Sequence, residues 1–177
     1  MGTAPALNRS YMQMCWLVPD LEAAIDGWAR SSGVGPFFWF DDVGATEGRH
    51  RGEPAEFPSS TAAIAYAGDI QIELVRQEND EPGIFRDLFP RGHYGLHHLA
   101  VICDDYEADR AAYVATGAEV AYEAQIGGRT RTCWVDTSPT LGFMVELLER
   151  SRARDMGFAT MRAAAESWDG QDPITRF

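Results

Sequence analysis

The sequence has no long apolar segment, although 45% of its 177 residues are hydrophobic. A membrane-spanning helix needs about 20 consecutive apolar residues, and every hydrophobic run in this chain is much shorter. The first ten residues are polar and lack the apolar core of a secretory signal peptide. These absences predict a cytoplasmic protein that does not cross a membrane.

Cysteine and basic residues are also scarce. The three cysteines, Cys15, Cys103 and Cys133, form an odd set without close spacing. We therefore expect buried free thiols in a reducing compartment. The 27 acidic residues outnumber the 15 basic ones, which gives a formal net charge of −12. This charge argues against nucleic acid or an anionic membrane as partner and leaves a small molecule as the expected ligand.

The first half of the chain has the pattern of a strand, a helix and three further strands. An apolar run over 11–18 precedes a helix over 21–32, which Asp20 begins as N-cap and Gly33 ends. The charged stretch over 41–60, which contains glycine and proline, is predicted to be a long loop. The three strand candidates lie over 36–40, 61–67 and 69–76.

The second half repeats this order of elements. An apolar run over 96–103 is a predicted strand, and Asp104 then begins a helix with Glu107 at capping-box spacing. Gly117 ends that helix. The remaining strand candidates lie over 118–124, 129–136 and 143–148.

Such a repeat predicts two βαβββ modules paired in one domain over residues 1–177. The first module covers about 8–80 and the second about 92–150, and together they form a curled mixed sheet that lines one cleft. The fold class is therefore α+β. Residues 151–177 form an extension with a helix over 152–168. We expect that helix to pack on its own domain or on a partner subunit, or else to cover the mouth of the cleft.

Four side chains of metal-ligating type occupy matching places in the two halves. Gln13 and His98 lie in the first strands, and Glu73 and Glu146 lie in the last strands. Strand alternation places each on a face that is otherwise mostly apolar, where a carboxylate is costly unless it is paired or binds a cation. Taken singly, each has an ordinary explanation as an edge carboxylate, a core amide or a core histidine. Their recurrence predicts a site for zinc, nickel, cobalt, manganese or iron rather than calcium.

The order of these motifs resembles that of the vicinal oxygen chelate superfamily, which includes glyoxalase I, methylmalonyl-CoA epimerase, extradiol dioxygenases and bleomycin-resistance proteins. The segments QMCWLVPDLEAAIDGW and GLHHLAVICDD resemble the openings of its two modules, with Gln where many members have His. IQIELV and GFMVELLE resemble the strands that carry its carboxylate ligands. The resemblance covers about residues 11–150. It implies the glyoxalase/bleomycin-resistance/dihydroxybiphenyl dioxygenase fold and a divalent transition metal held by Gln13, Glu73, His98 and Glu146.

The resemblance implies an isomerase or epimerase that moves a proton next to a carbonyl of a small organic or acyl-thioester substrate. Glu146 is the expected general base, with Glu73 as the alternative. A glyoxalase I-type lactoylglutathione lyase stays open, although Leu17 stands where glyoxalase I enzymes generally carry an arginine for glutathione. A ring-cleaving dioxygenase and a non-catalytic protein that binds an aromatic ligand are further alternatives. A homodimer is expected.

Seven further residues are predicted to contact the substrate. They comprise strand neighbours of the four ligands, one aromatic residue, one histidine at the rim and one arginine for an anionic group: Cys15, Leu17, Ala100, Met144, Trp39, His93 and Arg131.

Overall fold

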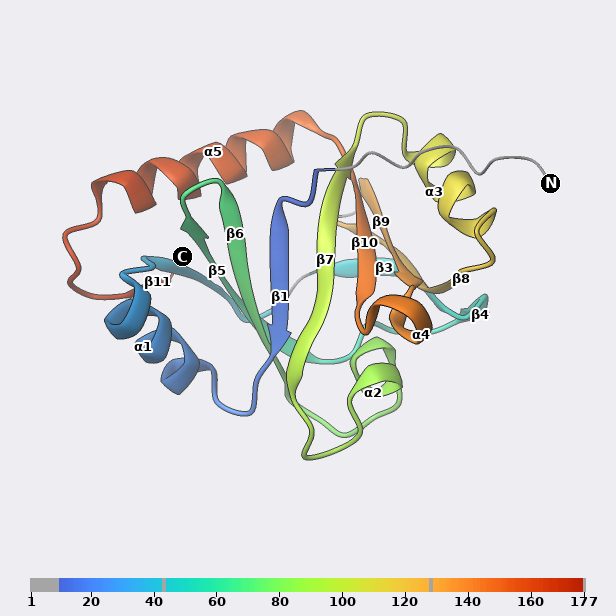
Figure 1. Cartoon of the computed structure of the whole chain (residues 1–177), viewed down its shortest axis with the longest axis horizontal. Helices are drawn as coiled ribbons and strands as arrows, with labels where there is room; N and C mark the ends of the chain where they lie inside the picture. Colours follow the sequence, from blue (N-terminus) through green and yellow to red (C-terminus); the bar gives the residue numbers. More distant parts are fainter. Residues whose placement is uncertain (1–9, 43, 128, 177) are drawn as a thin grey trace.

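The computed structural model describes residues 10–42, 44–127 and 129–176, whose strands form one mixed sheet (Figure 1). The expectation about the polar N-terminus concerns residues 1–9, which lie outside the described residues. The order of strands across the sheet is β11-β2-β5-β6-β1-β7-β10-β9-β8-β3-β4. The strands are β1 Gln13–Leu17, β2 Phe37–Phe40, β3 Ala45–His50, β4 Glu53–Pro54, β5 Ser60–Ala67, β6 Ile70–Gln77, β7 Gly95–Cys103, β8 Glu119–Ile126, β9 Thr130–Asp136, β10 Met144–Glu149 and β11 Ile174–Arg176.

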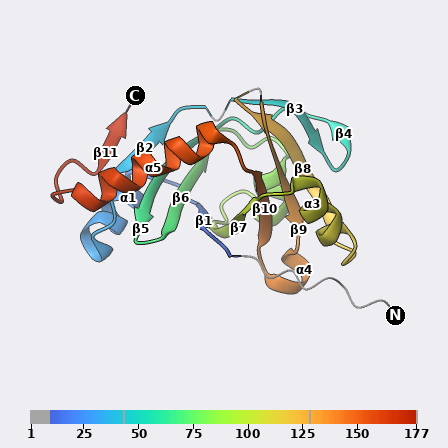
Figure 2. The same ribbon diagram turned by 90° about the horizontal axis from the view of Figure 1, so that it is seen from above.

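The first and last strands of the two modules form the centre of the sheet. β1 pairs in parallel with β6, β7 pairs in parallel with β10, and β1 and β7 join the modules as an antiparallel pair. The sheet curls without closing, as the view from above shows (Figure 2). The predicted α+β fold of paired modules around a curled mixed sheet is confirmed.

Two helices cover the outer face of the sheet, one for each module. α1 (Leu21–Ser32) packs on β2, β5 and β6, whereas α3 (Tyr106–Val114) packs on strands of the second module. Asp20 caps α1 by accepting a hydrogen bond from the Ala23 N–H at 2.9 Å, and Gly33 ends it in the left-handed conformation, as predicted.

The predicted start of α3 is wrong by one residue. Asp105, not Asp104, accepts the capping hydrogen bond from the Ala108 N–H at 3.0 Å. Asp104 instead pairs with Arg150 at 2.5 Å. Two adjacent aspartates offer the same capping group, so the direction of the chain after β7 decides which of them caps the helix.

The stretch over 41–60 is not a single long loop, because it contains β3 and β4. β3 pairs with β8 of the second module, with Thr46 opposite Gln125 and His50 opposite Tyr122. The partner strand is more than 70 residues away in sequence, so the local pattern carried no sign of this pairing. The helices α2 (Ile84–Leu88) and α4 (Ser138–Leu141) and the strand β11 were likewise not predicted.

The helix of the extension, α5 (Arg152–Ser167), packs on the inner face of β2 and β5 (Figure 2). Its residues Phe158 and Met161 contact Phe38 and Tyr66 in a separate apolar cluster. At the other end of the extension, β11 pairs in parallel with β2. The helix and the strand of the extension therefore both pack on their own domain. None of the described helices combines the length and apolarity needed to cross a membrane. The three cysteines are free and buried, as predicted.

Candidate functional site

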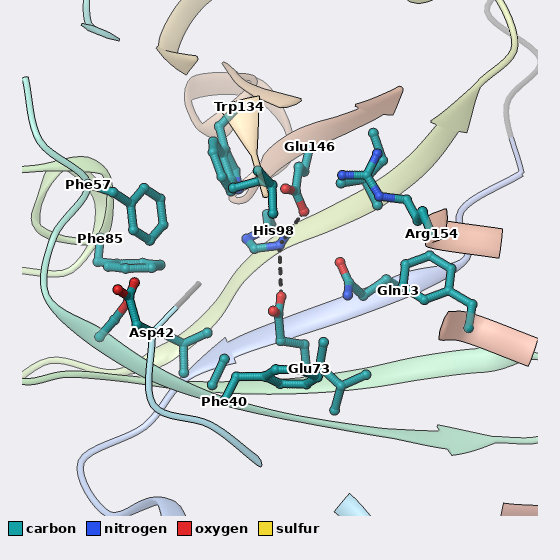
Figure 3. A pocket seen from close by; sticks show the side chains of 17 residues that line it. Gln13, Phe40, Asp42, Phe57, Glu73, Phe85, His98, Trp134, Glu146 and Arg154 are labelled. Carbon is teal, nitrogen blue, oxygen red and sulfur yellow. Dashed lines mark ion pairs between the residues drawn. The ribbon is translucent and has the colours of Figure 1, made fainter. Parts of the chain in front are cut away.

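The four predicted ligands lie on the four central strands and point toward one another (Figure 3). The Nε2 atom of His98 lies 3.3 Å from Oε2 of Glu73 and 3.1 Å from Oε2 of Glu146. Gln13 lies beside them on β1, and its side chain reaches the same space. Two parallel strand pairs thus bring residues that are up to 133 positions apart into one group.

His97 fixes the orientation and the tautomer of His98. The Nε2 atom of His97 lies 3.1 Å from the carbonyl oxygen of Ile84, so this nitrogen carries the proton. Its Nδ1 atom, 2.9 Å from Nδ1 of His98, is then the acceptor, and His98 donates from Nδ1. Burial, followed by the charge of His98, lowers the pKa of His97 to about 3, which keeps His97 neutral. His98 therefore turns Nε2 toward the carboxylates.

A β-bulge explains how two consecutive histidines can touch each other. Cys15 pairs with His98 and Trp16 pairs with Leu96, so His97 has no partner on β1. An extra residue of this kind bends the strand and redirects side chains, and bulges are frequent next to active sites. The bulge places both imidazole rings inside the protein, where His97 is 0% and His98 2% exposed.

The other ligands are also held by neighbouring side chains. Gln13 donates from Nε2 to Oε1 of Gln71 at 2.9 Å, and Gln71 donates in turn to the hydroxyl of Tyr66 at 2.9 Å. Thr132 donates to Oε1 of Glu146 at 2.8 Å. These bonds leave Oε1 of Gln13 and Oε2 of Glu146 directed at the shared space (Figure 3). Partners of this kind orient metal ligands and tune their affinity.

Two buried atoms of this group lack a hydrogen-bond partner among the described residues, namely Oε1 of Gln13 and Nε2 of His98. An unpaired polar atom in the interior costs about 1–3 kcal/mol of folding free energy. A cation at this point would satisfy all four groups. The donor set of one imidazole, one amide oxygen and two carboxylates fits a transition metal.

A fifth candidate atom lies among the ligands. The sulfur of Cys15 and ligand atoms of Glu73 and His98 all lie within 4.8 Å of one another. Burial and the charge of Glu73 raise the pKa of the Cys15 thiol, against the opposing effect of His98. Cys15 is 0% exposed, so it lies beneath the ligands rather than in the space above them.

A cavity of about 260 Å³, here called the central cavity, opens above the four ligands. Five aromatic side chains line it, together with aliphatic residues and a few polar groups beyond the ligands. The aromatic residues are Phe40, Phe57, Phe85, Trp134 and Phe158, and the added polar residues are Asp42, Ser60 and Arg154.

The two ends of the central cavity differ in chemistry. At one end, the ring of Phe57 lies 5.7 Å from the ring of Phe85 and 5.6 Å from that of Trp134. At the other end, α5 brings Arg154 close to Gln13 and Glu146 (Figure 3). The site therefore joins an aromatic end, the group of four candidate metal ligands and a cationic end.

Gly48 helps to hold the aromatic end in place. The hydroxyl of Tyr122 donates to the carbonyl oxygen of Ala55 at 3.1 Å, which fixes the segment that precedes Phe57. A Cβ atom at Gly48 would lie 2.1 Å from that hydroxyl, so only glycine leaves room for the bond.

None of the seven residues predicted to contact the substrate is among those that line the central cavity. The strand neighbours of the ligands (Cys15, Leu17, Ala100 and Met144) lie in the interior below it, each at most 1% exposed. Trp39 faces α1 on the outer side of the sheet, and His93 lies on the exposed surface. Arg131 pairs with Glu149 at 2.6 Å. Other side chains of the strands, mainly from β2, β5, β8 and β9, form the walls together with residues of the loops, α2 and α5.

The sequence reasoning did not identify the residues that support or surround the ligands. His97 and Gln71 lie one and two positions from predicted ligands, so proximity to them was the available signal. Arg154 had only its position on the predicted final helix as a signal. Phe57 and Phe85 had none, because their segments showed no regular pattern.

Comparisons with known proteins agree with this geometry. The sequence model of the Glyoxalase/Bleomycin resistance protein/Dioxygenase superfamily matches residues 12–134. No curated protein matches the sequence significantly. Methylmalonyl-CoA epimerase from Mycobacterium tuberculosis has a similar structure, with a TM-score of 0.58 and 18% identity over 88% of this chain and 97% of that one.

Two further structures show the same similarity. A hypothetical protein from Bacillus halodurans C-125 has a TM-score of 0.58 and 15% identity, over 82% of this chain and 96% of that one. A variant of Streptomyces coelicolor methylmalonyl-CoA epimerase, in complex with 2-nitronate-propionyl-CoA, has a TM-score of 0.56 and 18% identity over 82% and 99%. At these identities, the likeness establishes the fold.

Proposed function

Because the chain belongs to the Glyoxalase/Bleomycin resistance protein/Dioxygenase superfamily, we propose that it is a metal-dependent isomerase or epimerase. In this proposal it removes and returns a proton next to a carbonyl group of a small organic or acyl-thioester substrate. The observation that carries the proposal is the convergence of His98, Glu73 and Glu146, with Oε1 of Gln13 buried beside them and without a partner among the described residues. The epimerase structures of the same fold support the reaction class.

The metal ligands in this proposal are Gln13, Glu73, His98 and Glu146. A bound divalent ion of zinc, nickel, cobalt or manganese would act as a Lewis acid and stabilise negative charge on the carbonyl oxygen. The chain itself supplies the orientation of the ligands, through the bonds from His98 to His97 and from Gln13 to Gln71. The apolar walls exclude water from the reacting group.

Glu146 is the proposed general base, and Glu73 is the alternative. Thr132 donates a hydrogen bond to Oε1 of Glu146, which fixes the position of the carboxylate relative to the cavity. Glu146 is 6% exposed. A carboxylate that takes a proton next to a carbonyl must lie within hydrogen-bond reach of that proton. Glu146 lines the cavity, so a substrate held above the proposed ligands would lie beside it.

The proposal is tested by metal content and by proton exchange. We expect about one transition metal per chain in the native protein, and exchange of the proton next to the carbonyl when acyl-thioesters such as methylmalonyl-CoA are incubated with it in D₂O. NMR follows the exchange. E146Q keeps an oxygen ligand but loses the base, so exchange should fall about 10²- to 10⁴-fold. E73Q is the matched variant, and a larger loss there than in E146Q would exchange the two roles.

A non-catalytic protein that binds an aromatic ligand is the second candidate. The cluster formed by Phe57, Phe85 and Trp134 favours it, because stacked rings suit a flat apolar ligand. The same experiment separates the two functions. A native protein that contains no metal and cannot be loaded with one would support the binding protein and contradict the isomerase. The cytoplasmic location and the homodimer stay predictions.

A further inference from the structure

The C-terminal helix adds a positive charge to the central cavity. Among the described residues, Arg154 from the first turn of α5 is the only arginine that lines this cavity (Figure 3), and Phe158 lines it from the next turn. One guanidinium N–H of Arg154 donates to the carbonyl oxygen of Glu149. Within the described ranges, no carboxylate forms an ion pair with Arg154, although most of the other arginines have one.

The half-buried Arg154 has carboxylates nearby but none in ion-pair contact among the described residues. Burial lowers the pKa of its guanidinium, and the neighbouring Glu146 and Glu149 oppose that effect. A buried charge is costly unless a counter-charge or hydrogen bonds compensate it. The planar guanidinium group, with its several donors, fits a carboxylate in a two-bond arrangement. The remaining N–H groups of Arg154 are therefore available to an anion in the cavity.

The charges of the other groups that line the cavity also favour an anionic ligand. Glu73 and Glu146 together would balance the charge of a bound divalent cation, so an occupied metal site would add no net positive charge. Asp42, the remaining acidic residue of the lining, is exposed and accepts a hydrogen bond from the Gly44 N–H at 2.9 Å. With a divalent cation bound, the half-buried Arg154 would be the charge of the lining that forms no ion pair with a described carboxylate.

The opposite end of the cavity offers two unused hydrogen-bond donors. Oγ of Ser60 and Nε1 of Trp134 are buried, with their residues 5% and 4% exposed, and neither atom has a partner among the described residues. Ser60 begins β5, whereas α5 packs on Tyr66 near the other end of this strand. A ligand can therefore meet a cation at one end and neutral donors toward the other.

We infer that α5 forms an anion subsite in which Arg154 binds a carboxylate of the substrate, while Ser60 and Trp134 donate hydrogen bonds to an acceptor on its apolar body. This inference rests on the proposed function, because it names the substrate class of the same site. The volume of 260 Å³ lies just below the range of about 300–1,000 Å³ for sites of drug-sized ligands. The substrate is therefore a compact organic acid, or an acyl-thioester whose larger group stays outside the cavity.

The test compares benzoate with benzamide, which have nearly the same shape and differ in charge. Binding of each is measured by calorimetry on zinc-loaded protein, for the native chain and for R154Q, R154K and R152Q. We expect R154Q to bind benzoate about 10- to 100-fold more weakly and to bind benzamide unchanged. R154K should keep part of the benzoate affinity. R152Q, which changes an exposed arginine of the same helix, should behave as the native chain.

The failures of the two proposals are distinguishable. Zinc titration of the same four proteins comes first, and a native chain that binds no zinc contradicts the metal-dependent function. In that case, the benzoate comparison is made on the metal-free protein instead of the zinc-loaded one. Equal benzoate affinity in the native chain and R154Q overturns the anion subsite, because the carboxylate then binds elsewhere. If R154Q fails to fold, R154K decides, and equal weakening of benzamide in R154K would also overturn the subsite.

Discussion

The central cavity and a second cavity, bounded by α3, β3, β8 and β9, have the same volume of about 260 Å³. Their polar groups differ. In the second cavity, Arg110 pairs with Glu123 at 2.9 Å, and Arg131 pairs with Glu107 and, at 2.6 Å, with Glu149. In the central cavity, four buried polar atoms have no partner among the described residues: Oε1 of Gln13, Oγ of Ser60, Nε2 of His98 and Nε1 of Trp134.

This difference distinguishes a cavity whose polar groups satisfy one another from a cavity whose polar groups require a ligand. The charges of the second cavity compensate one another, so its polar side chains already have the partners that they need. The unsatisfied atoms of the central cavity cost free energy until something binds them. Volume alone does not distinguish the two cavities, whereas the state of their hydrogen-bonding groups does.

The largest effect is expected for metal binding in H98A. Removing the imidazole deletes the one nitrogen ligand, between two carboxylates, so the protein should retain no stoichiometric metal after dialysis. Mass spectrometry of the purified protein measures this. The matched variant in the second cavity, E123Q, should keep the native metal content. Stoichiometric metal in H98A would place the metal elsewhere.

A smaller effect is expected when a supporting residue of the central cavity is changed. Q71L removes the acceptor that orients the amide of Gln13 and should weaken metal affinity about 10- to 100-fold. Competition with a chelator measures the affinity, and circular dichroism checks that the variant is folded. Q125L, in the second cavity, removes a bond to Glu47 and should leave metal affinity unchanged. Equal losses in both variants would indicate a general loss of structure.

The smallest effect is expected for the free energy of unfolding when Glu149, the partner of Arg131 at the second cavity, is changed. A hydrogen bond from Arg131 lowers the pKa of Glu149 below its ordinary value of 4.5, and this exceeds the opposing effect of burial. The pair therefore stabilises the fold above that pH, and the contribution is lost as the pH falls through the lowered pKa. E149Q should cost about 1 kcal/mol at pH 7.

Chemical unfolding at neutral and acidic pH checks this prediction. The difference between E149Q and the native chain should shrink as the pH falls through the lowered pKa of Glu149, because the protonated carboxyl is then uncharged like the glutamine of the variant. A difference that stays constant between the two conditions would mean that packing, rather than the ion pair, explains the loss.

The sequence alone determined the order of the elements and the identity of the proposed ligands. α1 has the predicted bounds and caps, and the six predicted strands that followed the two openings appear within about two residues of their predicted limits. Periodic apolar residues and capping residues act over a few positions, so this information is local and readable. The four ligands were found because the repeat gave each of them a counterpart.

The tertiary structure alone decided which side chains surround the ligands. The pairing of β3 with β8, the contact of His97 with His98 at a bulge and the approach of Arg154 from α5 join segments that are distant in sequence or depend on strand register. Such contacts arise when the whole sheet curls and the last helix packs on its inner face, and no local pattern encodes them. The chain thus specified its proposed ligands by periodicity, whereas long-range packing placed the side chains that form the walls, orient His98 and bring Arg154 to the site.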